Sequence, residues 1–149
     1  MDLPTGKSLP YWKTGRTAAE HWIRKACAEI ERAGGTIDVC FPSAYQGGRT
    51  AHVVGFSLDG DSFKLVWPLL EHDPPEAEAA LRQTATMLYH DVKSRCIAAR
   101  VFGARWAFHA EWLLPDGRSI GQLTTPELLQ ELPQMALLAG PKETRREAG

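Results

Sequence analysis

The segment 91–114, DVKSRCIAARVFGARWAFHAEWLL, constrains the fold more than any other part of the chain. Apolar residues occupy almost every side of a helix built from it, and such a helix belongs in the middle of a domain. The segment also carries four cations: Lys93, Arg95, Arg100 and Arg105. Because an unpaired internal charge is very costly, we predict that at least one arginine is largely buried and bonded to a carboxylate or a backbone carbonyl. Asp38 and Glu111 are the candidate carboxylates.

Length and charge set the broad class. The chain has 149 residues and a formal net charge of −1. This length suggests one domain that can bury roughly 70% of its unfolded surface, so neither a metal nor a disulfide is required for folding. A balanced charge argues against coating nucleic acid through bulk charge, although a local basic face is compatible with it.

The cysteines and the apolar runs bear on the compartment. Three cysteines without paired spacing, Cys27, Cys40 and Cys96, are typical of reduced and mostly buried thiols. No run reaches the ~18 apolar residues that a membrane-spanning helix needs, and the N-terminal residues lack an apolar leader. We therefore expect a cytoplasmic protein that does not associate with membranes.

Helical and strand periodicities predict the order of elements. Thr17 with Glu20 forms a capping box for a first helix that Gly34 and Gly35 end. Three strands with period-two alternation follow, the last two joined by an Asp59–Gly60 hairpin turn. Their apolar positions should pack against the helices: Ile37, Val39, Phe41, Val54, Phe56, Phe63, Leu65 and Trp67.

The second helix begins near Pro74 and Pro75, which suit a first turn. Its pattern runs to Leu114, with Gly103 as a candidate break, and a short helix over 127–138 comes next. We thus predict a single-domain α+β fold of order α-β-β-β-α-α, in which helices cover one face of an antiparallel three-stranded meander.

The predicted organisation has three parts. Residues 1–16 form an extended basic arm that Tyr11 and Trp12 pin to the domain. Residues 17–138 form the α+β domain, and residues 139–149 form a disordered tail.

Several residues resemble a family of small uncharacterised proteins of phages and mobile elements, in which a strand precedes a long helix of A-x-R-V-x-W-R type. The matching residues are Phe63, Leu65, Pro68, Ala98, Arg100, Val101, Trp106 and Trp112. The resemblance implies a phage or mobile-element setting near DNA replication or recombination genes. It implies no activity and no site residues.

A basic helical face is the first candidate site. On a continuous helix Arg82, Tyr89, Lys93 and Arg100 fall within about 40° of one another. Cations neutralise phosphates and a tyrosine can stack on a base, so this face is a candidate nucleic-acid path that Lys13 and Arg49 extend. The structural alternative is that these side chains pair with carboxylates or lie at the edge of the core. Trp12 is the candidate contact for a protein partner.

Two other functions carry specific objections. A double-stranded-RNA-binding domain shares the element order, but it needs lysines where this chain has the acidic stretch 74–78. A metal-dependent nuclease would use Asp38, Asp61 and Lys64. The spacing of the last two sends them to opposite faces of a strand.

We therefore expect no metal, no cofactor and no enzymatic activity. The leading hypothesis is an accessory protein of a phage or mobile element that associates with DNA, RNA or a nucleoprotein complex through weak, salt-sensitive contacts. The alternative is a protein-binding adaptor or inhibitor of host or defence machinery, which would use the open face of the sheet or the tryptophans. The nuclease remains a second alternative.

Overall fold

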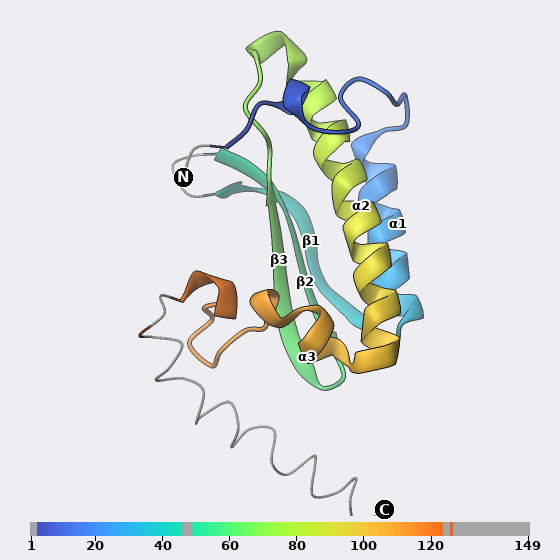
Figure 1. Ribbon diagram of the computed structural model, residues 1–149, viewed down its shortest axis with the longest axis vertical. Coiled ribbons are helices and arrows are strands. Elements are labelled where there is room, and N and C mark those ends of the chain that lie inside the picture. The colour runs from blue at the N-terminus through green and yellow to red at the C-terminus, as the bar shows by residue number, and fades with distance from the viewer. Residues whose placement is uncertain (1–2, 46–48, 124–125, 127–149) are drawn as a thin grey trace, which may run out of the picture.

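The computed structural model describes residues 3–45, 49–123 and 126, and the side chains of 41–45 and 49 are outside this description. Its main elements are α1 (Ala19–Arg32), β1 (Thr36–Tyr45), β2 (Arg49–Leu58), β3 (Asp61–Pro68), α2 (Ala77–Phe102) and α3 (Ala104–Ala107). The strands form an antiparallel sheet of order β1-β2-β3. Figure 1 shows α1 and α2 side by side on one face of this sheet, so the predicted α+β class is confirmed.

Cross-strand pairing sets the register of the sheet. β2 pairs with β3 from Leu58 opposite Asp61 back to Ala51 opposite Pro68. The predicted turn between them is present, with φ of 53° at Asp59 and 81° at Gly60. Positive φ at both central residues matches the twist of the flanking strands, which explains why this hairpin is tight.

A bulge in β1 corrects one part of the predicted core. The register shifts between Ile37 and Val39, which reverses the alternation beyond that point. Val39 pairs with Gly55 and is 41% exposed, so its predicted inward orientation is wrong. Cys40 occupies the inward position instead, and its sulfur meets Cys27 on α1. The side chain of Phe41 is outside the described part.

The core lies between the sheet and the two helices. The strand residues that we predicted to face the helices, apart from Val39 and Phe41, belong to it or pack against it: Ile37, Val54, Phe56, Phe63, Leu65 and Trp67. The rings of Phe56 and Phe63 stack with centroids 5.3 Å apart, and Phe108 meets Phe56 edge-on at 5.0 Å. Offset and edge-on ring pairs of this kind add stability beyond the area that they bury.

Both predicted helix boundaries need adjustment. α1 begins at Ala19, and no side chain caps it, so the Thr17–Glu20 capping box is wrong. A 3₁₀ turn, η3 (Pro74–Glu76), precedes α2, with the two prolines in its first positions, where a helix needs no N–H donor. α2 stops at Phe102 rather than continuing to Leu114, because Gly103 has φ of 96° and turns the chain. None of the described helices is long and apolar enough to cross a membrane.

The chain after α3 returns to the sheet through two further 3₁₀ turns, η4 (His109–Glu111) and η5 (Ile120–Gln122). Trp112 forms an antiparallel bridge with Phe63, and the Leu113 N–H donates to the Ser62 carbonyl at 2.9 Å. This return covers the free edge of β3 near its start (Figure 1). The predicted helix 127–138 and tail 139–149 lie outside the described residues.

The N-terminal segment is folded against α2, so the prediction of an extended arm is wrong for its described part. It contains a 3₁₀ turn, η1 (Gly6–Ser8), and pairs with Glu71 through a parallel bridge at Thr5. The buried side chain of Gln83 explains the docking: its Nε2 donates to the carbonyls of Gly6 at 2.7 Å and Pro10 at 2.9 Å. As predicted, Tyr11 helps to pin the segment, because its ring stacks on His90 at 5.2 Å.

Replacing Gln83 by leucine should release this segment. The variant leaves buried carbonyls without a donor, which we expect to lower the free energy of unfolding by about 1–3 kcal/mol. Urea denaturation measures that loss, and trypsin should cleave after Lys7 and Lys13 faster than in the wild type. Ser94→Ala, an exposed change on the same helix, is the control. Unchanged trypsin sensitivity in Gln83→Leu would contradict the anchoring role.

Candidate functional site

The predicted basic face exists, but most of it contacts other parts of the protein. Arg82 Nη1 donates to the Gly15 carbonyl at 3.2 Å, and Arg100 Nη2 donates to the Arg32 carbonyl at 3.1 Å. Lys93 is exposed, with its Nζ 6.0 Å from the centroid of the Tyr89 ring. The periodicity therefore identified one side of α2 correctly, but α1 and the segments that flank it contact three of the four side chains, Arg82, Tyr89 and Arg100.

Tyr89 is the decisive member of this set. It is only 6% exposed, and its ring lies 5.4 Å from the ring of Trp22 on α1. The Nζ of Lys25 lies over the same ring, 4.6 Å from its centroid. A base could stack on Tyr89 only if α1 separated from α2, so the structure does not present this side chain for stacking.

The remaining predicted contacts are distributed elsewhere. Lys13 forms an ion pair with Glu76, and Lys7 lies 3.8 Å from the same carboxylate. The hydrogen bond from Lys13 is the main cause that lowers the pKa of Glu76. Trp12 is half-buried beside Gly6, and the Lys13 ammonium lies 5.5 Å from the centroid of its ring. Its ring therefore packs within the N-terminal segment, which leaves only part of it accessible to a protein partner. The side chain of Arg49 is outside the described residues.

Two of the embedded arginines are held by carboxylates, as predicted. Arg95 bonds to Asp91 at 3.0 Å and to the candidate Glu111 at 2.6 Å. Arg105 makes a two-pronged contact with Asp61 at 2.7 and 3.0 Å. Their side chains are 27% and 28% exposed, so burial is partial. Asp38, the other candidate, accepts a hydrogen bond from Ser57 instead and was wrongly assigned.

Arg95 and Arg100 make a matched pair for a stability test. Arg95→Met strands two partly buried carboxylates, and we expect it to cost about 2 kcal/mol of unfolding free energy. Arg100→Met removes one bond from an exposed side chain and should change stability by about 0.5 kcal/mol or less. Urea denaturation at neutral pH compares them. Equal losses in the two variants would show that the Arg95 contacts do not stabilise the fold.

An exposed apolar surface lies where α2 meets α3. It consists of four side chains that are 59–68% exposed, Ile97, Val101, Phe102 and Trp106, which we call the apolar corner. The rings of Phe102 and Trp106 lie 4.5 Å apart. Sequence reasoning missed this surface because it treated the whole segment 91–114 as buried. The i, i+4 spacings of Ile97 with Val101 and of Phe102 with Trp106 were the signal that could have identified it.

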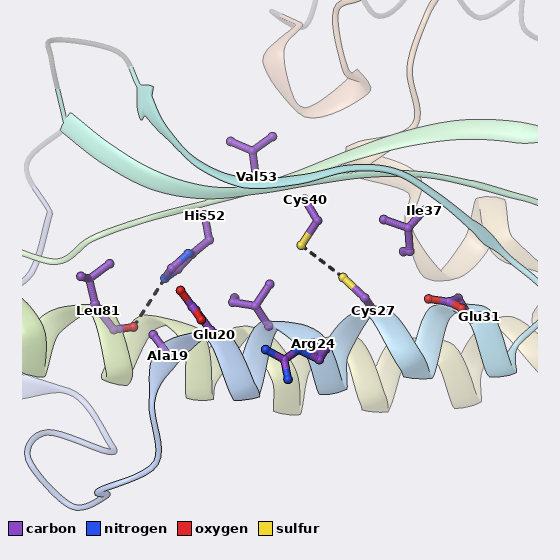
Figure 2. Close-up of a pocket in the computed structure, with 11 residues that line it drawn as sticks. Ala19, Glu20, Arg24, Cys27, Glu31, Ile37, Cys40, His52, Val53 and Leu81 are labelled. Carbon is purple, nitrogen blue, oxygen red and sulfur yellow. Dashed lines mark hydrogen bonds between the residues drawn. The ribbon is translucent and has the colours of Figure 1, made fainter.

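A cavity of about 570 Å³ separates α1 from the sheet. Figure 2 shows Cys40 and His52 pointing into it from the strands and Cys27 from α1, whereas Val53 points away. The two sulfurs are 3.3 Å apart, with the Cys27 thiol donating, and His52 Nε2 lies 3.5 Å from the Leu81 carbonyl. The remaining lining residues are Ala19, Glu20, Ile23, Arg24, Glu31 and Ile37.

Burial controls protonation inside this cavity. Burial and the hydrogen bond with Cys40 raise the pKa of Cys27 to about 12, so its thiol keeps its proton at neutral pH. Burial also lowers the pKa of His52, which is therefore neutral. Across the described ranges no cluster of three or more His, Cys, Asp or Glu side chains is placed to hold a metal ion. The cavity offers thiols, a neutral imidazole and apolar walls.

Comparisons with protein-family models, curated proteins and solved structures found no match for this chain. Function must therefore be argued from the apolar corner, the cationic side chains near it and the cavity.

His52 should make stability depend on pH. Its folded-state pKa lies below the ordinary value of 6.5, so the unfolded chain binds a proton first as the pH falls. The stabilisation is complete above pH 6.5 and declines as the pH falls below it, by at most about 1.4 kcal/mol per pH unit. Melting curves at pH 7.5 and 5.5 test this, because His52→Gln should lose less stability than the wild type. Equal losses would contradict it.

Proposed function

We propose that the protein is a non-enzymatic binding factor that recognises a protein partner through the apolar corner. The single observation that carries this proposal is the exposure of Ile97, Val101, Phe102 and Trp106 on adjoining turns. Contiguous exposed apolar side chains with cationic neighbours are typical of protein-binding surfaces, and tryptophan is prominent among residues that dominate binding energy.

The cationic side chains beside the apolar corner indicate the charge of the partner. Lys93 lies one turn before Ile97, and Arg100 adjoins Val101 on the same helix. Within the described part of the chain neither cation has a carboxylate within ion-pair distance, whereas Arg95 and Arg105 do. An apolar centre beside unneutralised cations complements an amphipathic segment whose apolar residues are flanked by Asp and Glu.

The nucleic-acid hypothesis has less support from the same geometry. Tyr89 is packed between the helices, and Arg82 and Arg100 already donate to backbone carbonyls. Lys93 and Arg100 could still contact phosphate, but the tyrosine that we predicted to stack on a base, Tyr89, is only 6% exposed. We therefore rank protein binding first. The phage or mobile-element setting, with host or defence machinery as the source of the partner, rests on the sequence resemblance and forms part of the proposal.

A designed helical peptide tests the chemistry of the partner. The probe is fluorescein-labelled and carries leucine and phenylalanine on one face with glutamate on both flanks. We expect the protein to raise its fluorescence anisotropy and salt to weaken binding. Trp106→Ala should weaken binding about 30-fold, the effect of losing ~2 kcal/mol at a binding hot spot.

Matched variants separate this surface from general stickiness. Val101→Ser should weaken binding, whereas Val39→Ser, an exposed valine on the sheet, should not. A probe with lysine in place of glutamate should bind poorly. Equal binding of both probes, or indifference to Val101→Ser and Trp106→Ala, would contradict the proposal. Salt-sensitive retention of single-stranded or duplex DNA in a mobility-shift experiment would favour the nucleic-acid alternative.

A further inference from the structure

We infer that Cys27 and Cys40 form a site of reversible oxidation, at which a hydroperoxide converts the two thiols into a disulfide that links α1 to β1. The inference does not depend on the proposed binding function. It rests on the sulfur contact, the unequal exposure of the two cysteines and the cavity beside them.

The two sulfurs are in direct non-bonded contact. They lie 3.3 Å apart and come from two different elements, Cys27 from α1 and Cys40 from β1. A disulfide bond is about 2.05 Å long, so the sulfurs must approach by roughly 1.3 Å. Figure 2 shows the two side chains pointing toward each other across the space between β1 and α1. The third cysteine, Cys96, is buried and has no described sulfur partner.

Exposure assigns different roles to the two thiols. Cys40 is exposed and lines the cavity, so a small peroxide can reach it, whereas Cys27 is buried. The Cys27 thiol donates its hydrogen bond to the Cys40 sulfur, so Cys27 is already directed at the atom that it must attack. Cys40 is therefore the attacking thiol and Cys27 the resolving one.

The reaction balances in two steps. The Cys40 thiolate attacks one oxygen of hydrogen peroxide, the O–O bond breaks, and hydroxide leaves and takes up the proton that Cys40 released. Cys40 is now a sulfenic acid. Cys27 then attacks its sulfur, the S–O bond breaks, and the departing hydroxide takes the Cys27 proton. Two thiols have lost two electrons and two protons, and the peroxide has become two waters.

Peptide mapping of the full-length protein tests the inference. After exposure to hydrogen peroxide and alkylation of free thiols, trypsin releases residues 26–32 and 33–49, each with one cysteine of the pair. We expect these peptides to be joined in one species, lighter than their sum by two hydrogen atoms, while Cys96 is alkylated. The oxidised protein should melt several degrees higher, because the linkage restricts the unfolded chain. Dithiothreitol should reverse both changes.

Two cysteine variants test whether the disulfide forms between Cys27 and Cys40. Cys40→Ser, a change at an exposed position, should abolish the linked peptide and the increase in melting temperature. Cys96→Ala should preserve both. Linkage through Cys96, dimers joined through Cys40, or Cys40 that stops at sulfinic acid without any linkage would each overturn the inference. The wild-type peptide map gives this answer even if a variant fails to fold.

Discussion

Two arginine ion pairs fix the chain that follows α2, and the surface of the molecule depends on them. Arg95 on α2 holds Glu111, and Arg105 on α3 holds Asp61 at the start of β3. Between these anchors Phe108 enters the core against Phe56. Because Arg105 contacts Asp61 and Phe108 packs in the core, the short α3 turns Trp106 toward solvent, beside Phe102. The contacts that satisfy the partly buried arginines therefore also place Trp106 next to Phe102 at the end of α2.

Much of the fold could be predicted from the sequence because local rules determine it. Period-two alternation identified the inward face of β2 and β3, and Asp59 with Gly60 specified their turn. The need to pair internal charge gave two candidate carboxylates, of which Glu111 does pair with Arg95. Asp38 could not be rejected in the same way, because its distance from the arginines depends on how the sheet meets α2. Tertiary contacts, rather than local preference, decided that assignment.

The candidate site was harder to predict, because helical periodicity shows which residues share a side and not what covers that side. Arg82, Tyr89 and Arg100 do share one, yet α1 and the N-terminal segment lie against it. The docking of that segment depends on Gln83, a single polar residue whose burial could not be predicted from the helical periodicity. Conversely, Ile97 and Val101 looked like core positions because their segment is apolar on every side.

The bulge between Ile37 and Val39 shows how one irregularity sets the chemistry of a cavity. With strict alternation Val39 would face α1 and Cys40 would face the opposite side of the sheet. The shift instead moves Val39 over Gly55, where no side chain obstructs it, and turns Cys40 toward Cys27. A small thiol then lines the wall that a branched apolar side chain would have filled, which leaves space between α1 and the sheet. The error in the predicted register and the origin of the sulfur contact therefore have the same physical cause.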